Sequence, residues 1–89
     1  MKIVDAFNTQ NPCLNVLVEM GFEVVLVAGD TDARLGDWRA TRDDVQIAAE
    51  DPIRLLGLAF LALSRGERWR REGDLDLHQK LVDDAYPDE

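Results

Sequence analysis

The spacing of apolar residues changes several times along the chain, and each change marks the boundary of an expected element. Asn11-Pro12 is typical of a helix start, because asparagine accepts hydrogen bonds from first-turn amides and proline tolerates the first helical position. Leucine and valine then recur at helical spacing as far as Gly21, which predicts a helix over about residues 12–20. The stretch before it, Ile3 to Phe7, is expected to form another short helical turn or an ordered arm on the core.

Three segments with the composition of strands follow this helix. Phe22 to Ala28 is rich in β-branched residues and bounded by glycines, while Trp38 to Arg42 and Val45 to Ala49 alternate in polarity. Asp43-Asp44 separates the last two as a tight turn, and the turn-forming residues from Gly29 to Asp37 predict a hairpin loop. We therefore expect three strands in an antiparallel meander.

Alternation also assigns side chains to the two faces of this sheet. The expected core-facing set is Trp38, Ala40, Val45, Ile47 and Ala49, and the expected outward set is Arg39, Thr41 and Gln46. The first strand is apolar on both sides, with Phe22, Val24 and Leu26 on one face and Val25 and Val27 on the other. We therefore expect both faces of the sheet to be covered.

The most apolar segment runs from Ile53 to Ser64 and follows Asp51-Pro52, a second pair of capping residue and proline. It predicts a central helix that ends at Gly66. Its apolar positions form two stripes, Ile53, Leu56, Phe60 and Leu63 in one and Leu55, Leu58, Ala59 and Ala62 in the other. One sheet face cannot cover both stripes, so we expect the terminal helices or a second copy of the chain to cover the remainder.

The C-terminal part of the chain combines a charged segment, Glu67 to Glu72, which is a connector or an extension of the central helix, with a last amphipathic helix. That helix is expected to begin at Asp74, after Gly73, and to end before Pro87. The order of elements predicts an α+β fold: an N-terminal helix, a three-stranded antiparallel meander, a long apolar helix packed on the sheet and a short C-terminal amphipathic helix. We expect a single domain over residues 1–89 with an acidic C-terminal segment, residues 72–89.

Composition limits the possible functions. The chain has 89 residues and a net charge of −8, which disfavours direct binding to nucleic acid or to an anionic membrane surface. A compact domain of this size would expose roughly 5,200 Å² of surface. The single cysteine, the absence of a signal-peptide pattern and the lack of a membrane-length apolar run favour a cytoplasmic protein.

Residues with possible chemistry occur singly, without the partners that a catalytic or metal site needs. Cys13 lies in the first turn of a predicted helix, whose dipole favours the thiolate, but no resolving cysteine or neighbouring base accompanies it. His78 is the only histidine, so a surface hydrogen bond to Asp74 or a solvated polar position is favoured over a metal site. The acidic loop lacks the spacing of a calcium-binding EF-hand, with its carboxylates at Asp30, Asp32 and Asp37. We therefore predict no catalytic residue, no metal and no cofactor.

One basic cluster stands out in this acidic chain. Four arginines surround Trp69, namely Arg65, Arg68, Arg70 and Arg71. Because acids follow at once, we expect these arginines to pair with the chain's own acidic segment or with an acidic partner, rather than with nucleic acid. Trp69 is expected either to cap the core or to anchor an interface.

The order helix, three strands, helix resembles that of double-stranded RNA-binding domains. Those domains begin their last helix with a lysine-rich sequence, whereas the corresponding start here is Asp51-Pro52-Ile53-Arg54, so the resemblance implies a topology and not RNA binding. The stretch from Val45 to Leu63 is also similar to small antitoxins that fold as a partial ribonuclease H sheet.

These observations favour a bacterial, non-enzymatic protein-interaction or regulatory module that binds a protein partner or a second copy of itself. The residues expected to carry the contact are Trp69, Arg68, Arg71, Leu55, Leu58 and Ala62. Two related alternatives stay open: an accessory subunit of a larger assembly, or an antitoxin-like or immunity-like inhibitor of a basic partner. A small enzyme that uses Cys13 is the remaining alternative.

Overall fold

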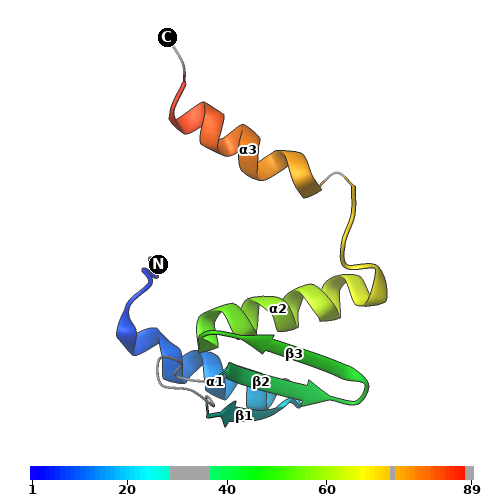
Figure 1. Ribbon diagram of the computed structural model, residues 1–89. Helices are drawn as coiled ribbons and strands as arrows, with labels where there is room; N and C mark the ends of the chain where they lie inside the picture. The colour runs from blue at the N-terminus through cyan, green and yellow to red at the C-terminus, as the bar shows by residue number, and fades with distance from the viewer. Residues whose placement is uncertain (29–36, 73, 88–89) are drawn as a thin grey trace.

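The computed structural model describes residues 1–28, 37–72 and 74–87 of the chain. Its elements, in chain order, are η1 (Phe7–Thr9), α1 (Gln10–Glu19), β1 (Glu23–Val27), β2 (Asp37–Arg42), β3 (Val45–Ala49), α2 (Pro52–Arg65), η2 (Gly66–Arg68) and α3 (Asp74–Ala85), where η denotes a 3-10 helix. The predicted α+β fold and its order of elements are confirmed (Figure 1). The loop expected between the first two strands falls at residues 29–36, outside the described residues.

The sheet is the predicted antiparallel meander, with strand order β1-β2-β3. Its register places Ala40 of β2 opposite Val24 of β1 and opposite Ile47 of β3. The tight turn after β2 contains Asp43 at φ 53°, a left-handed conformation that aspartate adopts more readily than most residues with a side chain. Because the strands follow one another in space, β3 is an edge strand with a single paired neighbour in the described sheet.

The core lies between this sheet and two helices that cover one of its faces. Its fully packed residues come from α1, α2 and the sheet: Leu17, Phe22, Ala40, Leu55 and Ala59. Partly buried side chains of β2 and β3 pack against them, namely Trp38, Val45, Ile47 and Ala49. The predicted core-facing set is therefore confirmed, and the predicted outward set is exposed.

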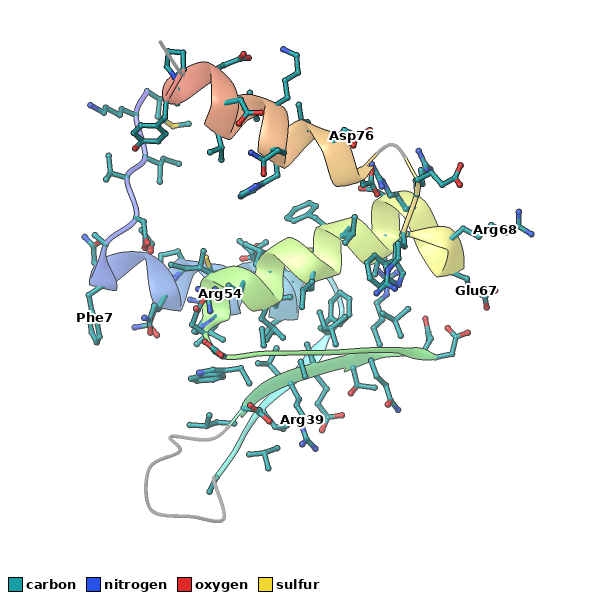
Figure 2. All side chains as sticks on the ribbon, turned by 45° about the horizontal axis from the view of Figure 1, so that its top comes forward. Phe7, Arg39, Arg54, Glu67, Arg68 and Asp76 are labelled. Atoms are coloured by element: carbon teal, nitrogen blue, oxygen red, sulfur yellow. The ribbon has the colours of Figure 1, made fainter. Side chains whose placement is uncertain are left out.

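No element of the described residues covers the other face of the sheet, so among them the expectation that both faces are covered is wrong. Val25 is 47% exposed, and its neighbours across the sheet are Arg39 and the exposed Ala48. Arg39 lies on the side of the sheet away from α2 (Figure 2). Val25 and Val27 reflect the strand preference of β-branched residues and do not indicate burial.

The N-terminal region differs from its prediction in two respects. α1 begins at Gln10, two residues earlier than expected, because η1 leads directly into it. The Thr9 hydroxyl donates to the Ala6 carbonyl oxygen at 2.6 Å and makes no cap to the helix, while Pro12 falls in the first turn, where no N–H is needed. Residues 1–6 are exposed and do not form an arm on the core.

The second half of the chain begins and ends its helices where the sequence predicts. The Asp51 carboxylate caps α2 by accepting a hydrogen bond from the Arg54 amide at 2.8 Å, and Gly66 ends the helix at φ 67°. α3 covers Asp74–Ala85 as predicted. However, α3 stands apart from the two-layer body (Figure 1), and its described side chains are all exposed.

The position of α3 makes the molecule extended. The Cα radius of gyration is 16.0 Å, whereas a compact chain of this length would have about 12 Å. The accessible surface is 7792 Å², compared with the roughly 5,200 Å² expected of a compact domain. Of the two terminal helices expected to cover α2, α1 does so and α3 does not.

Candidate interaction groove

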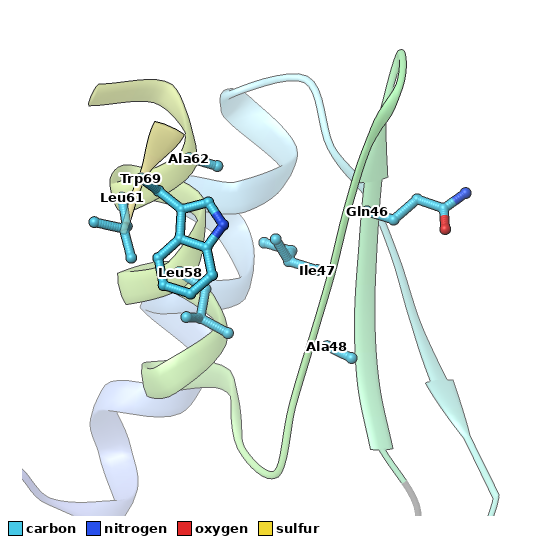
Figure 3. A pocket seen from close by; sticks show the side chains of 7 residues that line it. All are labelled: Gln46, Ile47, Ala48, Leu58, Leu61, Ala62 and Trp69. Carbon is cyan, nitrogen blue, oxygen red and sulfur yellow. The ribbon is translucent and has the colours of Figure 1, made fainter. Parts of the chain in front are cut away.

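A small apolar groove lies between β3 and α2, beside the open edge of the sheet. Its lining residues are Gln46, Ile47, Ala48, Leu58, Leu61, Ala62 and Trp69, and its volume is about 240 Å³. Figure 3 shows Ile47 directed toward α2 and Trp69, while the Gln46 side chain points away from the helix. Sites for small molecules usually measure about 300–1,000 Å³, so this groove has the size for one or two apolar side chains.

The position of the groove follows from the way α2 packs on the sheet. Leu55 and Ala59, one turn apart, face the core and are fully buried. Leu58 and Ala62 repeat at the same spacing on the neighbouring flank of the helix, beside β3. Leu58 remains 38% exposed because no element of the described chain packs over the edge strand.

Trp69 forms the end wall of the groove. It follows η2, and the Arg65 guanidinium donates a hydrogen bond to its carbonyl oxygen at 2.9 Å. The Arg70 guanidinium lies 4.7 Å from the centre of the indole ring, a cation–π contact that restricts the ring further. Trp69 is 42% exposed, so one part of the ring lines the groove and another part faces solvent.

A hydrogen-bonded elbow, residues 65–74, joins the end of α2 to the start of α3. One oxygen of the Asp74 carboxylate accepts a hydrogen bond from Arg65 at 2.6 Å and another from the Arg71 amide at 3.0 Å. The hydrogen bond from Arg65 is the main reason that the pKa of Asp74 lies below its ordinary value, and the Arg71 amide lowers it further. The expected pairing of the arginine cluster with the acidic segment is confirmed for Arg65 and Asp74.

Two of the remaining arginines, Arg70 and Arg71, lie next to Trp69 at the end of the groove. A second hollow is lined by residues of the elbow itself, namely Trp69, Arg70, Arg71, Glu72 and Asp74. Arg68 and Arg71 are both exposed. The apolar groove therefore ends at a basic rim, although the protein as a whole is acidic.

The structure brings together three of the predicted contact residues, Leu58, Ala62 and Trp69, and places Arg68 and Arg71 beside them in the elbow. Leu55 does not belong to this surface, because it is fully buried against the sheet and α1. The sequence pattern placed Leu55 and Leu58 in one stripe of the helix, but only Leu55 faces the core, while Leu58 is 38% exposed.

The groove also contains residues that were not among the predicted contact residues, namely Gln46, Ile47, Ala48 and Leu61. The alternating pattern of the last strand placed Ile47 on the helix side, and the meander order made that strand an edge. These two signals together could have located the groove beside the third strand.

The candidate chemical residues stay separate. Cys13 is half-buried on α1, and Ser64 and His78 are exposed on α2 and α3. Of the two alternatives for His78, the solvated position agrees with its exposure, while Asp74 bonds to Arg65 and Arg71. The described residues contain no group of three or more potential metal ligands. None of the described helices has the length and apolar character needed to cross a bilayer.

Comparison of the chain with models of protein families, with curated proteins and with solved structures finds no significant match to any of them. The features of the molecule that bear on function are therefore the groove, the elbow and the exposed apolar surfaces themselves.

Proposed function

We propose that this chain is a non-enzymatic protein-interaction module that receives an extended segment of a partner protein along β3. The observation that carries the proposal is the apolar groove between α2 and β3, an edge strand that has one side without a paired neighbour in the described sheet. An edge strand offers backbone N–H and C=O groups to an added strand, and a neighbouring groove selects the side chains that the added strand presents.

Charge indicates the kind of segment that fits. Arg70 and Arg71 line a hollow together with Trp69, the end wall of the groove, and both are exposed in a protein of net charge −8. An acidic side chain at one end of an apolar segment would meet these arginines, whereas elsewhere the protein repels it. The proposed ligand is therefore an extended segment with one or two apolar anchors and an acidic end.

The size of the groove favours this ligand over a substrate or cofactor. A volume of about 240 Å³ accommodates an anchor side chain, and the groove lining contains no ionisable side chain. Catalysis of proton transfer needs a positioned ionisable group close to the reacting atoms. Contact is thus the role that these residues support, as a regulatory module or as an accessory subunit in the cytoplasm.

The test uses a phage-displayed library of random peptides of about eight residues, selected on the wild-type protein. We expect enriched peptides with alternating apolar positions and an acidic residue toward one end. Leu58→Asp should weaken their binding at least about tenfold, because it places a charge in the groove. Phe60→Asp, on the opposite flank of the same helix, is the matched control and should leave binding unchanged.

Two results would contradict the proposal. One is a selection that enriches no common pattern, and the other is equal binding of the enriched peptides to the wild-type protein and to Leu58→Asp. Amide chemical shifts provide a second measurement, because a peptide on the edge strand should move the signals of Gln46 and Ala48 first. A peptide that moves only signals of α3 would place binding elsewhere.

The acidic side of α3 supports a second candidate, an inhibitor of a basic partner. Asp76, Asp83 and Asp84 are exposed on one side of that helix, together with Lys80. Such a contact would depend on charge and would weaken steeply as salt increases, while apolar peptide binding at the groove would not. Binding of a lysine-rich peptide at low and high salt, measured on the full chain, distinguishes the two.

A further inference from the structure

α3 is an amphipathic helix whose apolar side has no covering element in the described chain. Leu77 and Leu81 are 59% and 57% exposed, and Val82 and Tyr86 are exposed beside them. On the opposite side, polar side chains of α3 bind one another: Gln79 donates a hydrogen bond to Asp83 at 2.8 Å, and Lys80 forms an ion pair with Asp84 at 3.2 Å. An isolated helix of 12 residues is marginal in water, so contact on the apolar side is needed to hold it.

α2 offers a matching surface on the flank away from the groove. Phe60 and Leu63 are 52% and 46% exposed there, beside the half-buried Ile53 and Leu56. The 14 residues of α2 make a helix of about 21 Å, and the 12 residues of α3 make one of about 18 Å. The two apolar stripes are therefore of similar length, and α3 could cover the exposed flank of α2 from end to end.

The elbow prevents α3 from covering the α2 of its own chain in this arrangement. Arg65 holds the Trp69 carbonyl oxygen and the Asp74 carboxylate at once, and the Asp74 amide donates to the Arg71 carbonyl oxygen at 3.1 Å. These bonds fix the start of α3 beside the end of α2 and direct the rest of α3 away from the two-layer body (Figure 1).

We propose that two copies of this chain form a two-fold dimer in which the apolar side of each α3 packs on the Phe60–Leu63 flank of the partner's α2. Both halves of the contact are present on one chain, which is the condition for a closed, isologous pair. The exposed area is also large enough for such an interface. The chain exposes 7792 Å², about 2,600 Å² more than a compact domain of its length, and a standard interface covers only about 800 Å² on each partner.

This dimer extends the proposed module but does not require the peptide groove, because the two contacts lie on opposite flanks of α2. The apolar character of the flank favours a second copy over a charged partner, even though each copy carries a charge of −8. Repulsion between two such copies falls as salt increases, so the dimer should hold or tighten at high salt, whereas a contact based on opposite charges would loosen.

Sedimentation velocity on the full chain from about 1 to about 100 μM tests the dimer. We expect a concentration-dependent species of twice the mass of the chain. Phe60→Asp and Leu81→Asp should each raise the dissociation constant at least about tenfold, and Gln79→Asp, which adds the same charge to the polar side of α3, should not. Far-UV circular dichroism confirms that each variant stays folded, since all three positions are exposed.

Cross-linking distinguishes exchange between copies from a helix that folds back on its own chain. In a Cys13→Ser background, Phe60→Cys and Leu81→Cys are prepared as separate proteins and mixed under mild oxidation. The exchange is supported if the disulfide between the Phe60→Cys protein and the Leu81→Cys protein forms more readily than a disulfide between two identical proteins.

Three results overturn the dimer proposal: a monomer at every concentration, a dimer that neither Phe60→Asp nor Leu81→Asp weakens, or a dimer that dissociates as salt increases. The peptide proposal is judged separately, because Leu58→Asp should remove peptide binding and leave the dimer, while Phe60→Asp should do the opposite.

Discussion

Truncation of Leu55 to alanine tests which side of α2 holds the fold together. Leu55 is fully buried in one cluster with Leu17 of α1 and Ala40 of β2. The change removes three carbon groups, worth about 2.4 kcal/mol at about 0.8 kcal/mol each, and the cavity left behind raises the cost to about 3–4 kcal/mol. A domain of this length has a free energy of unfolding of about 4–13 kcal/mol, so the variant loses a large part of it.

Urea unfolding followed by far-UV circular dichroism measures this cost. With a slope of about 1–1.5 kcal/mol per molar urea, the midpoint should fall by about 2–4 M. Leu58→Ala is the matched control on the same helix: its side chain borders an open groove, so truncation leaves no enclosed cavity and should cost about 1 kcal/mol. The packing described for α2 is refuted if Leu55→Ala costs less than Leu58→Ala, or if the two are equal.

Three further predictions concern the backbone and the elbow. Gly57→Ala should stabilise the chain by about 0.5–1 kcal/mol, because a Cβ at this helical position meets no atom within 4 Å. Gly21→Ala should destabilise the chain, because the backbone there has a φ of 92°. Thermal unfolding measures both effects, and a variant order opposite to this one would contradict the prediction. Asp51→Ala should lower the free energy of unfolding by about 1 kcal/mol, because α2 loses its cap, whereas Asp51→Asn should keep most of that stability. Urea unfolding measures both variants, and an unchanged midpoint for Asp51→Ala would be inconsistent with the cap. Arg65 lowers the pKa of Asp74, so the elbow should be fully formed at pH values above the ordinary aspartate pKa and lost as the pH falls through the lowered value. An NMR titration of the Asp74 carboxyl carbon measures this pKa. A pKa at or above the ordinary value would exclude the bond to Arg65.

The local pattern of the chain was sufficient to predict most of the elements. The boundaries of β3 and α3 follow from strict alternation and from Asp74 after Gly73, and α2 follows from Asp51-Pro52, because caps, prolines and turn residues act over a few neighbours. The start of α1 was misplaced because η1 precedes it, and a 3-10 turn leaves little signal in apolar spacing.

The site was only partly predictable for a geometric reason. The sequence identified Leu58, Ala62 and Trp69 as apolar positions available for contact, and it placed Ile47 on the helix side of its strand. It could not assign Leu55 to the core, since a helix that is apolar on several sides does not reveal which side meets the sheet.

By itself, the sequence determined the order and type of the helices and strands, where α3 begins, and which side chains of β2 and β3 face the core. Only the tertiary structure decided that the outer face of the sheet is open, that a groove lies beside β3 and that α3 stands apart from α2. The first set depends on contacts between near neighbours in the chain, which a sequence pattern encodes. The second set depends on which apolar face of each helix or strand packs against which other element. Several such pairings are compatible with one sequence pattern, so the choice is made only when the elements pack together.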